Sequence, residues 1–136
     1  MSTKVLLGGL IAGIAFFVLG YLIFGMLLNS TMEAYMNAAC ARPMEEIRMG
    51  YLIFGNLFMG LAVSYIYSRW IGPHSFASGA KPGAILGLLI ALGMDLMFFG
   101  LSTMWTEQMG FVIDVIGSVV LWTIVGGLVG WWYGRK

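Results

Sequence analysis

Residues 5–28 read VLLGGLIAGIAFFVLGYLIFGMLL, an apolar run without a single charge. The run lies within 28 uncharged residues that separate Lys4 from Glu33. A helix needs about 20 apolar residues to cross a hydrocarbon core that is about 30 Å thick. The run is longer than the roughly 7–15 apolar residues of a signal peptide, and no A-x-A cleavage pattern follows it. We therefore expect a permanent transmembrane anchor here.

Three further apolar runs follow along the chain. Twenty uncharged residues separate Arg48 from Arg69. Another 20 separate Asp114, the last acid of the chain, from Arg135. Between Lys81 and Glu107 lie 25 residues, of which Asp95 is the only charged one. Runs of this length favour helices over barrel strands, which need only about 9–11 residues. The sequence predicts one all-α integral membrane domain (1–136), a four-helix bundle with short loops and spans near residues 5–28, 49–67, 83–101 and 111–132.

The overall composition excludes several classes of protein. Of the 136 residues, 60% are hydrophobic and 10% charged, and the mean hydropathy is +0.92. Soluble domains have about 45–50% apolar and about 25% charged residues, so a soluble enzyme and a disordered chain are excluded. Seven Lys and Arg against six Asp and Glu give no basic surface for a nucleic acid. The single cysteine, Cys40, cannot form an intramolecular disulfide.

The distribution of basic residues predicts the orientation in the membrane. Four spans place both termini and the loop between the second and third spans on one side. The other side carries only Arg42 and Arg48. Because the more basic side is cytoplasmic, we expect both termini in the cytoplasm, of a bacterial inner membrane. The aromatic residues near 65–70 and 131–133 are expected at the inner membrane boundary. The five basic residues on the side of the termini are Lys4, Arg69, Lys81, Arg135 and Lys136.

Small residues recur at four-residue spacing in each span. In lipid, helices associate where small side chains allow their backbones to approach, so such stripes mark packing faces. We interpret them chiefly as contacts within one bundle, although stripes on several faces leave room for a partner. Gly134, at the membrane edge, is expected to tolerate a larger side chain. The predicted helix-packing residues are Gly9, Gly13, Gly60, Gly83, Gly87, Gly126 and Gly130.

Two acids within the spans are the candidates for chemistry. Asp95 and Asp114 both continue small-residue stripes, and they belong to the third and fourth spans, which are neighbours in a hairpin. Asn56 has a similar predicted depth in the second span. An ionisable residue inside a span is expensive and usually functional. We predict that Asp95, Asp114 and Asn56 form an intramembrane polar site. A structural role, above all for Asp114, and a functional role both stay open.

The run Gly20-Tyr21-Leu22-Ile23-Phe24-Gly25-Met26-Leu27-Leu28 resembles the aromatic-glycine run of small bacterial four-helix integral membrane proteins of unknown function. The chain length and the number of spans are also similar. The resemblance implies the four-helix fold, and it carries no activity.

The sequence contains no phosphate-binding loop, nucleophile–base pair or metal-binding cluster. We therefore expect no enzyme, no catalytic residue, no cofactor and no metal. The expected partners are the lipid bilayer and other membrane-protein subunits or a second copy; a small-molecule substrate stays unknown. Two functions stay open: an accessory or structural subunit that packs through its small-residue faces, or a small proton- or cation-linked transporter or channel that uses the predicted polar site.

Overall fold

The computed structural model describes residues 3–27, 49–101 and 108–135 of the chain. This part of the chain is all-helical, and its four main helices are long and apolar enough to cross a membrane. The predicted four-helix, all-α architecture is therefore confirmed. The helices are α1 (Thr3–Gly20), extended by the π-helical segment η1 (Tyr21–Leu27); α3 (Met49–Ile66), extended by the π-helical segment η4 (Tyr67–Ile71); α4 (Phe76–Leu101); and α5 (Gln108–Gly134).

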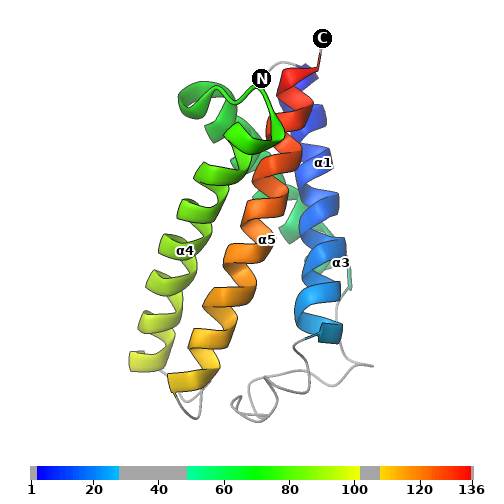
Figure 1. Cartoon of the computed structure of the whole chain (residues 1–136). Helices are drawn as coiled ribbons and strands as arrows, with labels where there is room; N and C mark the ends of the chain where they lie inside the picture. The colour runs from blue at the N-terminus through cyan, green and yellow to red at the C-terminus, as the bar shows by residue number, and fades with distance from the viewer. Residues whose placement is uncertain (1–2, 28–48, 102–107, 136) are drawn as a thin grey trace.

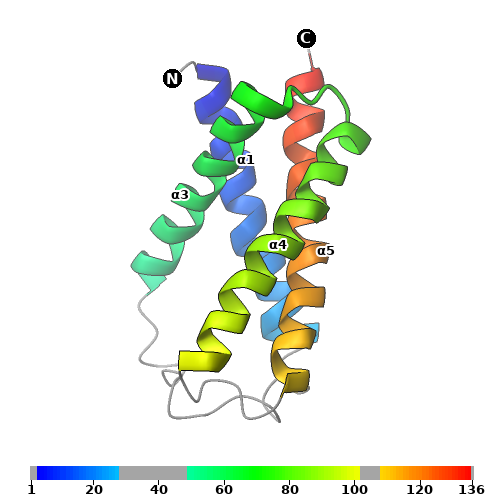
Figure 2. The ribbon, with the colours of Figure 1, turned by 90° about the vertical axis from the view of Figure 1, so that its left-hand side faces the viewer.

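The helices form two antiparallel pairs. Helix α4 packs along α5, α1 packs along α3, and contacts between α1 and α5 join the pairs. Both chain ends lie at the same end of the bundle (Figure 1). We call the half next to them the terminal half and the other the distal half. Figure 2 shows α3 close to α1 in the terminal half and separated from it toward the distal half.

Helix α4 begins at Phe76, earlier than the predicted span, because its first turn is capped by two serines. The backbone N–H of Ser78 donates to Ser75 Oγ (3.1 Å), and the N–H of Ser75 donates to Ser78 Oγ (2.9 Å). This reciprocal pair is a capping box. Ser78 and Gly79 therefore belong to the first turn of the helix. Pro82 lies inside α4.

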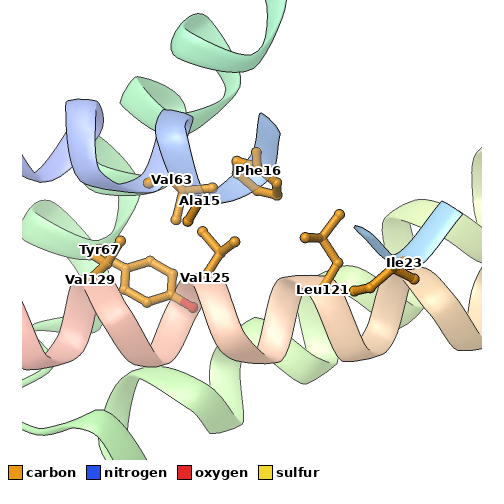
Figure 3. Packing of buried hydrophobic residues seen from close by; sticks show 9 residues of the cluster. Ala15, Phe16, Ile23, Val63, Tyr67, Leu121, Val125 and Val129 are labelled. Atoms are coloured by element: carbon orange, nitrogen blue, oxygen red, sulfur yellow. The ribbon is translucent and has the colours of Figure 1, made fainter. Parts of the chain in front are cut away.

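The core follows the contact between the two pairs. It joins Ala12, Ala15 and Phe16 of α1 to Val125 and Val129 of α5 (Figure 3). The Phe16 ring meets the Trp122 ring edge-on, with centroids 5.2 Å apart, a favourable arrangement for aromatic pairs. Large apolar side chains are exposed around the outside of the bundle.

Candidate functional site

The contact between α4 and α5 depends on glycine. A Cβ on Gly87 would lie 2.6 Å from Cβ of Trp122, and a Cβ on Gly126 would lie 2.5 Å from the carbonyl oxygen of Gly79. A Cβ on Gly130 would lie 2.9 Å from Cα of Gly79. These separations are shorter than a real Cβ allows, so the two backbones touch only because side chains are absent. Gly83 belongs to the same face, where its Cβ would overlap the carbonyl oxygen of Trp122.

The contact between α1 and α3 is built in the same way. A Cβ on Gly60 would lie 2.5 Å from Cα of Gly13, and one on Gly13 would lie 2.8 Å from Cα of Leu57. A Cβ on Gly9 would lie 2.9 Å from Cα of Leu61. The seven glycines chosen from the sequence as packing residues therefore all lie at close backbone approaches within the bundle.

The surroundings of Gly134 differ from the expectation that this residue is open to a larger side chain. A Cβ there would overlap the carbonyl oxygen of His74 and lie 2.8 Å from its carbonyl carbon. The end of α5 is therefore packed against the segment that precedes α4. The prediction that Gly134 tolerates a larger side chain is wrong, because depth in the membrane does not report contact with a connecting segment.

Asp95 lies on the packed face of α4. It is 6% exposed, and Asp114 on α5 is partly buried. Gly87 faces Ser118 and Trp122, and further along the same pair the rings of Phe99 and Phe111 are 5.3 Å apart. An antiparallel register that satisfies both contacts sets Asp95 level with residues 110–114. The α4–α5 contact thus holds both predicted acids in the distal half.

Asn56 belongs to the other helix pair. Its amide Nδ2 donates to the carbonyl oxygen of Leu52 at 2.7 Å, one turn back in α3. The carbonyl oxygen of Asn56 itself lies at the contact with Gly13 of α1. The structure therefore brings the two acids onto neighbouring helices and assigns the Asn56 amide a hydrogen bond within its own helix.

Tyr67 links the two helix pairs in the terminal half. Its side chain is fully buried (0% exposed), and its hydroxyl donates to the carbonyl oxygen of Gly79 at 2.9 Å. A Cβ on Gly83 would lie 3.1 Å from that hydroxyl, and a Cβ on Gly126 would overlap it. The glycines of α4 and α5 thus form a slot for a tyrosine that follows α3. The Tyr67 ring, expected with the other aromatic residues near 65–70 at the membrane boundary, is thus buried between the helix pairs.

A second polar contact ties α1, α3 and α5 together near the termini. The hydroxyl of Ser64 donates to the carbonyl oxygen of Val5 (2.7 Å) and lies 2.5 Å from the hydroxyl of Tyr133. The Tyr133 hydroxyl also contacts the carbonyl oxygen of Ser64 at 2.9 Å, as a donor. A Cβ on Gly8 would lie 2.7 Å from Ser64 Oγ. Satisfied hydroxyls of this kind fix helices relative to one another in lipid.

The sequence could have indicated part of this network. Ser64 lies four residues after Gly60 on the small-residue stripe of the second span. Tyr67 and Tyr133 carried no distinguishing signal, because a tyrosine near the end of a span is usually interfacial. Burial of Tyr67 depends on a glycine slot formed by two other helices, which a local pattern does not reveal.

Across residues 3–27, 49–101 and 108–135, no group of three His, Cys, Asp or Glu side chains could hold a metal ion. The chain matches no family model, no curated protein and no solved structure.

Proposed function

We propose that the protein is a non-catalytic integral membrane protein that acts as a structural or accessory subunit of a larger membrane complex, with both termini in the cytoplasm of a bacterial inner membrane. The orientation follows from the excess of basic residues on the side of the termini. The proposed docking surface is the distal half of α3 and α4. We propose that it receives small-residue helix faces of another subunit.

The observation that carries this proposal is a set of open glycines. Among the described residues, no atom lies within 4 Å of a Cβ built on Gly50 or Gly55 of α3, or on Gly93 or Gly100 of α4, apart from the chain neighbours and the backbone of the same helix. In the terminal half, glycines serve close helix contacts. A bare glycine on a lipid-exposed face leaves a depression that a second helix fills better than a disordered acyl chain.

The side chains around these glycines support the same reading. Tyr51, Phe54 and Phe58 of α3 are 76%, 63% and 69% exposed. Aromatic residues are enriched in the cores of protein interfaces. A surface that alternates bare glycines with large rings is typical of a packing face, whereas a uniform aliphatic surface is sufficient against lipid.

The alternative function is a small proton- or cation-linked transporter or channel that uses Asp95, Asp114 and Asn56. The burial of Asp95 at the level of residues 110–114 favours it, because a buried acid within a span is costly. Ion transport also needs polar groups at successive depths. In the described terminal half, the α4–α5 contact is closed by Gly79, Gly83 and Gly126 with the Tyr67 ring between them.

Purification in a mild detergent distinguishes the two functions. As a subunit, the wild-type protein should carry a partner at fixed stoichiometry, and Gly55→Leu should release it. Among the described residues no atom lies within 4 Å of a Cβ on Gly55, so the variant should keep the unfolding temperature of the wild type. The control is Ile85→Leu, which changes the shape of an exposed side chain on α4. This variant should keep the partner.

The transport function gives the opposite outcome. The protein would then purify as a single species, and in liposomes it would conduct ions in a pH-dependent way. Asp95→Asn would fold normally and abolish that flux, because an amide does not exchange a proton. A lone species with Asp95-dependent flux would overturn the subunit proposal.

Orientation has its own test. An impermeant thiol reagent added to intact cells should label Cys40, and a reporter fused after Lys136 should be cytoplasmic. Labelling of Cys40 only after the membrane is disrupted would reverse the proposed orientation.

A further inference from the structure

The start of α1 and the end of α5 enclose a groove in the terminal half. The groove is open to the outside, has a volume of about 350 Å³, and is lined by Thr3, Lys4, Leu7, Trp132 and Arg135. It lies between the first turn of α1 and the last turn of α5, and the indole Nε1 of Trp132 donates to the carbonyl oxygen of Lys4 at 2.9 Å. The groove is therefore part of the folded bundle.

Two cationic side chains are held at the rim of the groove. The ammonium of Lys4 donates to the carbonyl oxygen of Arg135 at 2.8 Å and lies 5.9 Å from the ring centroid of Trp132. The guanidinium of Arg135 lies 5.1 Å from the ring centroid of Trp131 and 5.8 Å from that of Trp132. Cation–π contacts of this kind restrain both cations. The groove is thus preorganised for an anion.

The charges of the described residues are separated along the bundle. Lys4 and Arg135 lie in the terminal half, whereas the two described acids, Asp95 and Asp114, lie in the distal halves of α4 and α5. In residues 3–27, 49–101 and 108–135 no carboxylate competes for the groove. An arginine and a lysine together suit a phosphate, because both donate charge-assisted hydrogen bonds.

An apolar surface leads away from the groove. Leu7 lines the groove, and Leu10, Ile14 and Val18 continue the same face of α1 toward the distal half. These four side chains are 41%, 47%, 52% and 47% exposed. Their spacing of three to four residues places them in one stripe. A cationic groove above an apolar stripe is complementary to an amphiphile with an anionic head, and a free anion would leave the stripe unused.

We propose that this groove binds the phosphate of an anionic phospholipid, with its acyl chain along the Leu7–Val18 face of α1. Basic pockets beside membrane helices, at the level of the headgroups, recognise anionic lipids in this way. Lys4 and Arg135 hold the phosphate, and the Trp132 ring forms the wall between them. The proposal does not depend on the subunit function, because it concerns the opposite half of the bundle.

Native mass spectrometry of the detergent-purified protein tests the proposal, with phosphatidylglycerol and phosphatidylcholine of matched chain length as probes. The wild type should retain phosphatidylglycerol in preference to phosphatidylcholine. Lys4→Gln and Arg135→Gln should each weaken retention about fivefold, the effect of one basic charge at a lipid surface. Lys4→Arg should restore it.

The matched control is Lys81→Gln, which removes an exposed cation from α4, outside the residues that line the groove. It should change retention less than twofold. Arg135 follows the end of α5, so its variant tests the groove even if Lys4→Gln fails to fold. Equal retention of the two lipids, or an equal loss in Lys81→Gln, would overturn the proposal. Displacement of the lipid by inorganic phosphate would also overturn it, in favour of a free anion.

Discussion

The terminal and distal halves of this bundle use the same residue types in opposite ways. In the terminal half, glycines of one helix contact the backbone of another, and Tyr67 and Ser64 add hydrogen bonds between helices. In the distal half, the glycines of α3 and of the last part of α4 face no other described helix. Figure 2 shows the corresponding separation of α3 from its neighbours.

The difference shows what a glycine stripe contributes in a membrane. In a bilayer, the lipid tails are as apolar as the helices, so burial of apolar surface alone does not hold two helices together. Close backbone approach and satisfied hydroxyls hold the terminal half together. The open glycines of α3 and α4 in the distal half have no facing helix among the described residues, and this is why we assign that surface to assembly.

Tyr67→Ala should give the largest loss of stability. It removes a fully buried ring and its hydrogen bond from the slot between the helix pairs. Large-to-small changes of buried aromatic residues destabilise by about 3–5 kcal/mol. Unfolding in mixed micelles measures the effect, with Tyr51→Ala on the exposed face of α3 as the control. Equal losses would show that Tyr67 does not link the pairs.

Gly126→Leu should be nearly as damaging. Its new Cβ would meet both the Tyr67 hydroxyl and the Gly79 carbonyl, and overpacking of this kind destabilises by about 1–3 kcal/mol or more. Gly93→Leu makes the same chemical change in the distal half. None of the described residues approaches a Cβ there within 4 Å, so this variant should leave the unfolding free energy of the isolated protein unchanged. If both variants were equally stable, the comparison between the halves would fail.

Gly134→Leu should have a smaller effect, about 1 kcal/mol. A Cβ there would overlap the carbonyl oxygen of His74, but α5 ends at this residue and its last turn can shift. The thermal midpoint of unfolding should fall below that of Gly100→Leu, the matched change at an open glycine of α4. Identical midpoints would show that α5 is free of the segment before α4.

Tyr67→Phe should have the smallest measurable effect. It keeps the ring in its slot and removes only the hydrogen bond to Gly79. Hydrogen bonds between membrane helices contribute about 0.6 kcal/mol on average. The unfolding free energy should fall by about that amount. A loss as large as that of Tyr67→Ala would assign the stability to the hydroxyl and not to the packing of the ring.

The sequence predicted the helices well because their cause is local. A run of twenty or more apolar residues between charges is long enough to cross a membrane as a helix. Residues 5–28 therefore indicate a span without any information on the other helices. The third span is predicted to start too late because it is counted from the charged Lys81, whereas the Ser75–Ser78 capping box stabilises an earlier start of α4.

The arrangement of the side chains was harder to predict. The stripe containing Gly87 and Asp95 indicated a packed face but not its partner. The burial of Tyr67 needs glycines from two other helices, and the groove at Lys4 needs the chain ends to meet. These features arise from tertiary contacts, for which periodicity within one helix holds no information.

The most direct test of the central claim measures the spread of α1 and α3 in each half. Spin labels on a Cys40→Ala background would replace Leu6 and Ile66 in the terminal half, and Val18 and Ile53 in the distal half; all four side chains are exposed. Pulsed dipolar spectroscopy of the isolated protein should give a short, narrow distance distribution for the first pair and a longer one for the second. Equal distances in the two halves would contradict the account, because α3 would then follow α1 along its whole length and leave no open distal face.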